Sequence, residues 1–263
     1  MIRQFQIVIY PILQAACFVA SWQLSALSWI ASASLLLLAA AFMCFTLHIS
    51  VHEVVHHWRW TSHQWVRRPV ESLLSCLIGL PYNIYRLSHW NHHRYNNQLD
   101  DFTSTWKLVD GKPAPRNRWT YTLLWIFNNR ALFDHTRYAG ETAKTDRRWV
   151  LADALVLLAF IGFLFMTNIT LGLLFLALNY FGWVLIFFMN YGQHPPVDYD
   201  RVMAVSHSSK AYNLIFFNNG LHHEHHVAPS KPIRDLVTDH KAPAIKRSHL
   251  LHGLFHPDST DQP

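Results

Sequence analysis

Four long apolar segments restrict the folds that are open to this chain. They cover residues 5–22, 26–50, 149–166 and 170–189. A helix needs about 20 apolar residues to cross the hydrocarbon core of a bilayer, and each segment has that length or nearly so. Only a few residues separate the first segment from the second, and the third from the fourth. The sequence therefore predicts two hairpins of membrane-spanning helices.

The composition favours the same interpretation. Hydrophobic residues make up 51% of the chain and charged residues only 14%, whereas soluble domains contain roughly 25% charged residues. The formal net charge is +6, but the basic residues are scattered and no nucleic-acid motif accompanies them. We therefore expect this charge to meet an anionic membrane surface, with no nucleic-acid partner. Cys17, Cys44 and Cys76 form no C-x-x-C pair, which argues against a disulfide scaffold or a zinc ribbon.

The positions of Lys and Arg predict how the spans are oriented. All 22 of these residues lie outside the two short turns between paired spans. They occur near the N-terminus, in residues 51–148 and in residues 190–263, and the positive-inside rule assigns such regions to the cytoplasm. We expect residues 1–263 to form one all-α, multi-pass integral membrane domain. Four helices would carry a helical cytoplasmic cap, and both termini would be cytoplasmic.

Histidines cluster where the predicted spans reach the cytoplasm. His52 and His56 have the i, i+4 spacing that places two side chains on one helix face, and two later clusters have the spacing i, i+3, i+4. Neutral imidazole is a common ligand for zinc, iron, copper and nickel. Nine histidines are candidate ligands at one cytoplasmic membrane mouth: His52, His56, His89, His92, His93, His194, His222, His225 and His226. His48 shares the face of His52, and we expect it to form a helix hydrogen bond, with a ligand role in place of His56 as the alternative.

The number of histidines indicates two metal ions. One tetrahedral zinc ion takes four ligands, so nine imidazoles fit two ions with four or five nitrogens each. Iron is the candidate, because a site at the membrane mouth suits the oxidation of an apolar substrate by dioxygen. A ferritin-type carboxylate centre needs two Glu-x-x-His pairs and two further glutamates. The chain has one such pair, Glu53 with His56, which argues against that type of centre.

Three of the clusters resemble the histidine boxes of the membrane fatty acid desaturase and hydroxylase superfamily. The boxes read His52-x-x-x-His56-His57, His89-x-x-His92-His93 and His222-x-x-His225-His226. Asn190-x-x-x-His194 resembles the additional ligand segment after the last span, in which the asparagine binds the metal through a water molecule. The resemblance covers His52 to about Pro229 and includes the arrangement of the spans.

The resemblance implies a di-iron oxidoreductase that uses dioxygen. Desaturation of a fatty acyl chain is the leading expectation, with no catalytic residue separate from the metal site. No fused cytochrome b5-like segment is visible, so electrons should come from a separate donor such as ferredoxin, rubredoxin or cytochrome b5. Six neighbours of the ligands are expected to support them. Glu53 and Glu224 would be hydrogen-bond partners, Asp100 and Asp101 would orient ligand histidines, and His57 and His223 would lie beside the ligands and not on the metal.

Some features resemble the short bacterial carotenoid ketolases. These are the compact chain, the His-His-Glu-His-His form of the last box with Pro229 after it, Arg86, and the pair Asp100-Asp101. His57 departs from that group, which typically has glycine there, and resembles the desaturases. Carotenoid ketolation or hydroxylation therefore stays open, as does hydroxylation of an alkane or a fatty acid.

Two interpretations from other classes of function also remain. His52-Glu53-x-x-His56 satisfies the His-Glu-x-x-His pattern of zinc metalloproteases, in which Glu53 would be the general base. That reading leaves most of the other histidines without a role. A metal transporter is the second reading, but transport sites usually lie along a pathway within the bilayer, whereas these histidines gather at one face.

Overall fold

The computed structural model describes residues 2–57, 63–129, 146–239, 241–245 and 260–261. The chain is mostly helical and divides into two compact units. The first unit contains residues 1–87 and 134–185, and the second contains residues 88–133 and 186–263. Two helices, α5 (Tyr82–Tyr95) and α10 (Ile169–Gln193), begin in the first unit and end in the second.

Three helical stretches are long and apolar enough to cross a membrane. They are Trp29–His56, Arg147–Thr167 and Ile169–Gln193, and they contain most of the predicted spans 26–50, 149–166 and 170–189. The predicted span 5–22 lies in α1 (Ile2–Leu24), whose described apolar part, Val8–Leu24, is shorter than the other three. An integral membrane protein is therefore supported, whereas the fourth span, the hairpins and the cytoplasmic side of the cap stay predictions.

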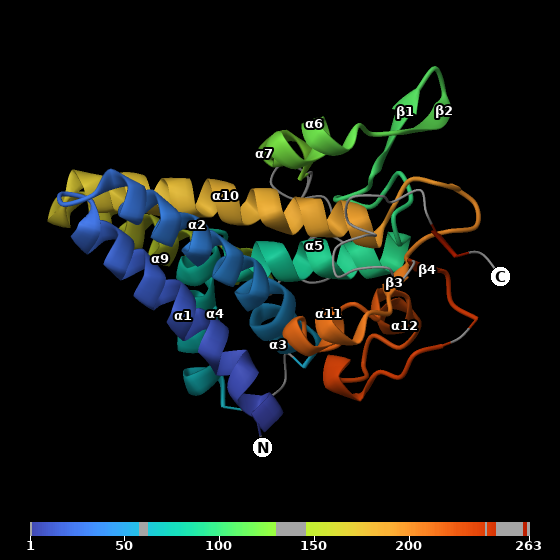
Figure 1. The fold of residues 1–263 in the computed structure, drawn as a ribbon, viewed down its shortest axis with the longest axis horizontal. Helices are drawn as coiled ribbons and strands as arrows, with labels where there is room; N and C mark the ends of the chain where they lie inside the picture. The colour runs from blue at the N-terminus through green and yellow to red at the C-terminus, as the bar shows by residue number, and fades with distance from the viewer. Residues whose placement is uncertain (1, 58–62, 130–145, 240, 246–259, 262–263) are drawn as a thin grey trace. The chain divides into compact units, whose positions relative to one another are not determined.

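In the first unit, α1 and α2 (Trp29–Phe45) pack side by side (Figure 1). Ser28 caps the start of α2, because its side chain accepts a hydrogen bond from the backbone of Ala31. Ser21 of α1 donates to the carbonyl of Ser32 across the buried contact, at 2.8 Å. This bond satisfies two polar groups that the apolar environment would otherwise penalise.

The helix that carries the first histidine box changes its winding just before the box. A π-helix covers Thr46–Val51, and α3 (His52–His56) follows it directly. The ring of His48 lies in this stretch and its Nδ1 atom bonds the carbonyl of Cys44 at 2.9 Å. The expectation that His48 forms a helix hydrogen bond is therefore confirmed.

The helix α4 (Gln64–Ile78) packs against α9 (Asp146–Thr167) and ends at a glycine. Gly79 has a φ of +60°, and a Cβ atom there would lie 1.7 Å from the amide oxygen of Asn179. Two side chains satisfy carbonyls of the last turn, which lack partners within the helix. Gln14 donates to Leu77 O at 2.6 Å, and Trp183 donates to Ile78 O at 2.8 Å.

The second unit contains short strands that the all-α expectation omitted. β1 (Trp106–Val109) and β2 (Lys112–Pro115) form an antiparallel hairpin. Its turn is Asp110-Gly111, and both residues have positive φ, as this tight hairpin turn requires. β3 (Ser206–His207), β4 (Ala244–Ile245) and β5 (Thr260–Asp261) form a second small sheet.

Short helices complete the second unit. α6 (Arg118–Leu123) and α7 (Trp125–Asn128) follow the hairpin. α11 (Lys210–Ile215) and α12 (His222–Val227) follow β3, and a single 3-10 turn covers Ile233–Asp235. These helices, together with the ends of α5 and α10, position the remaining histidines.

Candidate metal centre

Helices present most of the candidate ligands. His52 and His56 lie in α3 of the first unit, with ring centroids 4.6 Å apart, as i, i+4 neighbours should be. The other seven lie in the second unit. They are placed by the end of α5 (His89, His92, His93), by the residue after α10 (His194) and by α12 (His222, His225, His226).

Four of these imidazoles form a compact group, which we call the His92 group: His92, His194, His222 and His226. One nitrogen of each lies within 4.8 Å of the others. The Nε2 atom of His222 lies 2.8 Å from Nε2 of His194 and 3.1 Å from Nε2 of His226. His92, His194 and His222 are buried. The four side chains therefore present nitrogens to one point that water does not reach freely.

These separations fit a shared metal ion better than hydrogen bonds between rings. A neutral imidazole has one N–H, so Nε2 of His222 cannot both donate to and accept from two similar nitrogens. Two nitrogens that are each about 2.1 Å from a metal and at right angles lie about 3.0 Å apart. The measured distances match that geometry, so the residues present fit a transition-metal ion.

Burial also sets the protonation state of this group. It lowers the pKa of His194 to about 3, with a further contribution from the neighbouring His92. Burial, followed by the adjacent histidines, holds the pKa values of His222 and His226 well below the usual range. The three rings are therefore neutral near pH 7, which is the form that binds a metal.

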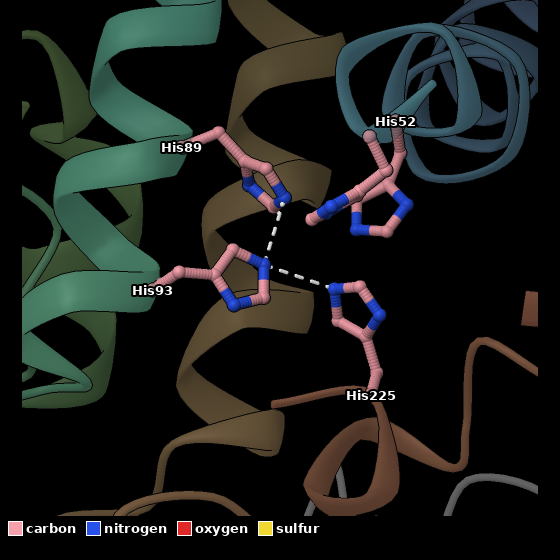
Figure 2. Close-up of side chains that lie close together, drawn as sticks. His52, His89, His93 and His225 are labelled. Atoms are coloured by element: carbon pink, nitrogen blue, oxygen red, sulfur yellow. Dashed lines mark hydrogen bonds between the residues drawn. The ribbon is translucent and has the colours of Figure 1, made fainter. Parts of the chain in front are cut away.

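Three further imidazoles form the His89 group, which consists of His89, His93 and His225. Their candidate nitrogens also lie within 4.8 Å of one another. Nε2 of His93 is 3.1 Å from Nε2 of His89 and 3.0 Å from Nε2 of His225. Dashed lines mark both contacts in Figure 2. Three nitrogens in this arrangement leave coordination positions open for further ligands.

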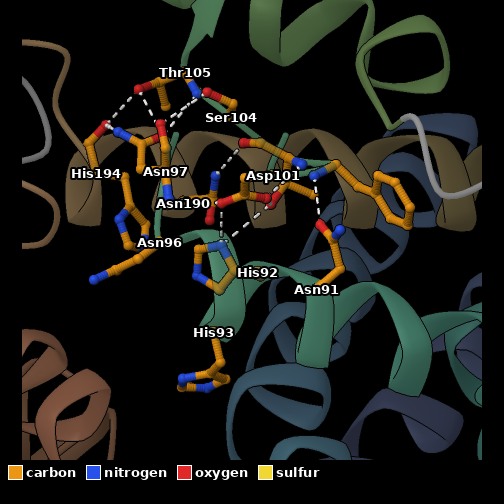
Figure 3. Close-up of polar contacts among 12 residues, drawn as sticks. Asn91, His92, His93, Asn96, Asn97, Asp101, Ser104, Thr105, Asn190 and His194 are labelled. Atoms are coloured by element: carbon orange, nitrogen blue, oxygen red, sulfur yellow. Dashed lines mark hydrogen bonds and ion pairs between the residues drawn. The ribbon is translucent and has the colours of Figure 1, made fainter. Parts of the chain in front are cut away.

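Asp101 supports His92 from behind. Its carboxylate lies 2.7 Å from Nδ1 of His92 and accepts backbone N–H bonds from Asn97 and Thr103. Figure 3 marks the contact between Asp101 and His92 with a dashed line. Burial alone would raise the pKa of the Asp101 carboxyl, but the charge and hydrogen bond of His92 outweigh it and lower the pKa to about 2. The ionised carboxylate fixes the N–H of His92 on Nδ1 and leaves Nε2 for a metal.

The structure separates Asp100 from Asp101. The Asp100 side chain is exposed, and its backbone carbonyl accepts a bond from Asn91 at 3.3 Å. Both aspartates were candidates for orienting a ligand histidine, and among the described residues Asp101 is the one that bonds such a ring. His194 has a support that has no sequence signal, because its Nδ1 atom bonds the backbone carbonyl of Met203 at 2.5 Å.

Glu224 anchors α12 from the side. Its carboxylate accepts a hydrogen bond from the hydroxyl of Ser206 in β3 and another from the backbone of Asp239 at 2.9 Å. Ser206 also accepts the backbone N–H of His223 at 3.2 Å. Glu224 thus fixes the helix that carries three candidate ligands.

In the first unit, Glu53 lies 3.7 Å from Nε2 of His57, whose side chain is 37% exposed.

Asn190 lies one helical turn before His194, and its backbone carbonyl accepts the His194 N–H at 2.9 Å. The amide nitrogen of Asn190 donates to the carbonyl of Thr103 at 3.2 Å and to the hydroxyl of Tyr121 at 2.7 Å. Tyr121 has no signal in the sequence, because it is a lone tyrosine 69 residues from Asn190 and belongs to no motif.

The family model described as Fatty acid desaturase matches residues 27–253, which is most of the chain. The chain belongs to the fatty acid desaturase family. A search among characterised proteins gives no match. For this desaturase family member, membership implies an oxidoreductase in a membrane with iron-dependent catalysis and a lipid substrate, and both histidine groups fit the metal.

Proposed function

We propose that the protein desaturates a fatty acyl chain at a di-iron centre, using dioxygen. The observation that carries the proposal is the His92 group, whose four nitrogens lie within 4.8 Å of one another without a carboxylate among them. An all-imidazole site distinguishes this chemistry from carboxylate di-iron bundles, which bind their metals largely through glutamates. Family membership and the apolar helices support a lipid substrate.

Two irons would use the two groups. The His92 group would hold one ion, and His89, His93 and His225 would hold the second. The proposal adds His52 and His56 as ligands of the second ion, because their i, i+4 spacing on α3 matches the first histidine box. Bound iron would supply the oxidising chemistry that removes hydrogen from an unactivated C–H bond.

The overall reaction balances with a separate electron donor. One dioxygen, two electrons, two protons and two hydrogens from adjacent carbons give one double bond and two waters. The electrons would come from ferredoxin, rubredoxin or cytochrome b5. Four spans with both termini cytoplasmic would place the centre on the side where these donors are found.

The chain's own residues would hold and orient the centre. Asp101 and the Met203 carbonyl fix the rings of His92 and His194 through their Nδ1 atoms. Asn190 would contact the metal through a water molecule. The protein would also hold the acyl chain in a narrow apolar tunnel, so that the two target carbons stay near the irons.

Expression in a host that makes β-carotene tests the proposal directly. The lipids would be profiled for new double bonds, and the carotenoids for new oxygen atoms. New unsaturated acyl chains with unchanged carotenoids are the expected result. New keto- or hydroxycarotenoids, or hydroxylated chains without unsaturation, would replace desaturation by one of the alternatives.

Matched variants on α12 connect the product to the histidines. His222→Ala removes a member of the His92 group and should abolish product formation. His223→Ala is the control, because the structure uses the backbone N–H of this residue, which the substitution keeps. Metal analysis of the unmodified protein should give two irons per chain, whereas one zinc per chain would favour the protease reading of His52-Glu53-x-x-His56.

A further inference from the structure

The amide of Asn190 is held in one orientation by a triangle of hydrogen bonds. Its Nδ2 atom donates to Thr103 O at 3.2 Å and to the Tyr121 hydroxyl at 2.7 Å, so both of its protons are used. The Tyr121 hydroxyl in turn donates to the same Thr103 carbonyl at 2.6 Å. A flipped amide would set its oxygen against the Thr103 oxygen, so only one orientation satisfies all three groups.

Tyr121 is itself rigidly placed. It is 1% exposed, and its ring packs against the rings of Phe187 and Tyr191 of α10, with centroids 5.1 and 5.6 Å away. Asn117 caps the start of α6 by accepting the backbone N–H groups of Trp119 and Thr120. Burial raises the pKa of the Tyr121 phenol, so the hydroxyl keeps its proton and can donate it to the carbonyl.

The triangle is also connected to His92, because Thr103 bonds the aspartate that orients the His92 ring. Thr103 donates its backbone N–H to Asp101 at 2.8 Å and its hydroxyl at 3.0 Å. Asp101 holds the ring of His92, and Asn190 precedes His194 by one turn. The hydroxyl of Tyr121 therefore stabilises two residues next to the His92 group. Thr103 bonds the aspartate that holds His92, and Asn190 lies one turn before His194.

We propose that Tyr121 is a positioning residue for the metal centre and acts through Asn190. By occupying the amide nitrogen, it leaves the carbonyl oxygen of Asn190 as the atom that can accept a hydrogen bond from a water at the His92 group. Tyr121 lies outside the three histidine boxes, and none of the sequence patterns assigns it a role. The inference rests on the proposed function, because it presupposes a metal at the His92 group.

Removal of one oxygen atom isolates this role. Tyr121→Phe keeps the ring and its packing but removes both hydrogen bonds of the hydroxyl. Tyr191→Phe is the matched control, because its hydroxyl donates to a different carbonyl, that of Arg116, at 2.8 Å. Asn190→Leu removes the amide at similar volume, and the double variant with Tyr121→Phe tests whether the two residues act together.

The assay is a titration of the purified full-length chain in detergent with Fe²⁺ under anaerobic conditions. The absorption spectrum of Co²⁺ bound in its place provides a second readout that does not depend on turnover. Tyr121→Phe and Asn190→Leu should each weaken the binding of one metal equivalent about tenfold, the lower limit for loss of a partner that orients the ligands. Both should change the Co²⁺ spectrum, whereas Tyr191→Phe should stay within about twofold of the unmodified protein.

The double variant decides between positioning and general structure. If Tyr121 acts through Asn190, the double variant should bind metal no more weakly than Asn190→Leu alone. Additive losses, equal weakening of both metal equivalents, or equal effects of Tyr121→Phe and Tyr191→Phe would overturn the inference while leaving the di-iron proposal intact. An unmodified protein that binds no iron would overturn both.

Discussion

Asp101→Asn is the most informative single substitution, because one buried carboxylate serves the metal site and the fold together. The carboxylate accepts bonds from Asn97 N at 2.9 Å, Thr103 N at 2.8 Å, the Thr103 hydroxyl at 3.0 Å and His92 Nδ1 at 2.7 Å. A carboxylate accepts at both oxygens, whereas an amide presents an NH2 group on one side. In Asp101→Asn, the NH2 group of the asparagine would therefore face donors that bond a carboxylate oxygen in the unmodified protein.

The cost follows from these contacts. A buried N–H group without an acceptor costs about 1–3 kcal/mol. The pKa of Asp101 gives a second measure, since a change from about 3.9 in the unfolded chain to about 2 in the folded one corresponds to about 2–3 kcal/mol. We expect Asp101→Asn to destabilise the metal-free protein by about 2–3 kcal/mol, or roughly 5–10 °C in unfolding temperature.

The sign of the pH dependence is fixed by the direction of this shift. The pKa of Asp101 is lower in the folded state, so its contribution is present in full above about pH 4 and is lost as the pH falls from about 4 to about 2. The difference in unfolding temperature between the unmodified protein and Asp101→Asn should therefore shrink over that interval. At pH 7 it should be at its maximum.

Tryptophan fluorescence during heating of the detergent-solubilised, metal-free protein measures the effect. Asp100→Asn is the matched control, because the Asp100 side chain is exposed. In the iron-loaded protein, Asp101→Asn should also weaken metal binding by about 10–100-fold, as loss of a partner to a ligating histidine does. Equal unfolding temperatures for the two aspartate variants at pH 7 would refute the reasoning.

Three further predictions concern other contacts. Gly79→Ala should lower the unfolding temperature more than Gly111→Ala does. Both glycines have positive φ, but only the new Cβ at Gly79 meets another residue, Asn179. A similar loss of unfolding temperature in both variants would contradict this. Glu224→Leu should destabilise the metal-free protein by about 2 kcal/mol, because it leaves the Asp239 N–H and the Ser206 hydroxyl without their acceptor. Glu224→Gln should retain most of that stability, because the amide can serve both partners, and thermal unfolding compares the two. Chelation of the metal from the loaded protein should lower its unfolding temperature, and added Fe²⁺ should restore it; an unchanged temperature would argue that the folded state binds no metal.

The sequence predicted the candidate ligands because their spacing is local. The i, i+3, i+4 pattern of His222, His225 and His226 depends only on the geometry of one helix. The supports behind the ligands depend on long-range contacts. Asp100 and Asp101 are equivalent as a sequence pair, and only the fold buries one of them beneath His92.

Other parts of the fold had little or no signal in the sequence. The bond from His194 to Met203 ends on a backbone carbonyl, which every residue possesses. Tyr121 reaches Asn190 across 69 residues, so no local pattern relates them. The hairpin of β1 and β2 did have a signal, since Asp110-Gly111 is typical of tight hairpin turns. The hairpin therefore corrects the expectation of an all-α chain in this segment.

The π-helix at Thr46–Val51 has a consequence for how this segment could vary between relatives. A π-turn closes its hydrogen bond one residue later than an α-turn, so it absorbs one extra residue within a helix. Deletion of one residue there would restore α-helical winding, and because the π-turn had absorbed that residue, the helix after it would keep its orientation about the axis. His52 and His56 would then stay on their present face, and the apolar pattern of Trp29–Phe45 would not change. The π-turn thus allows this segment to differ by one residue in length without turning either the apolar side chains or the candidate metal ligands.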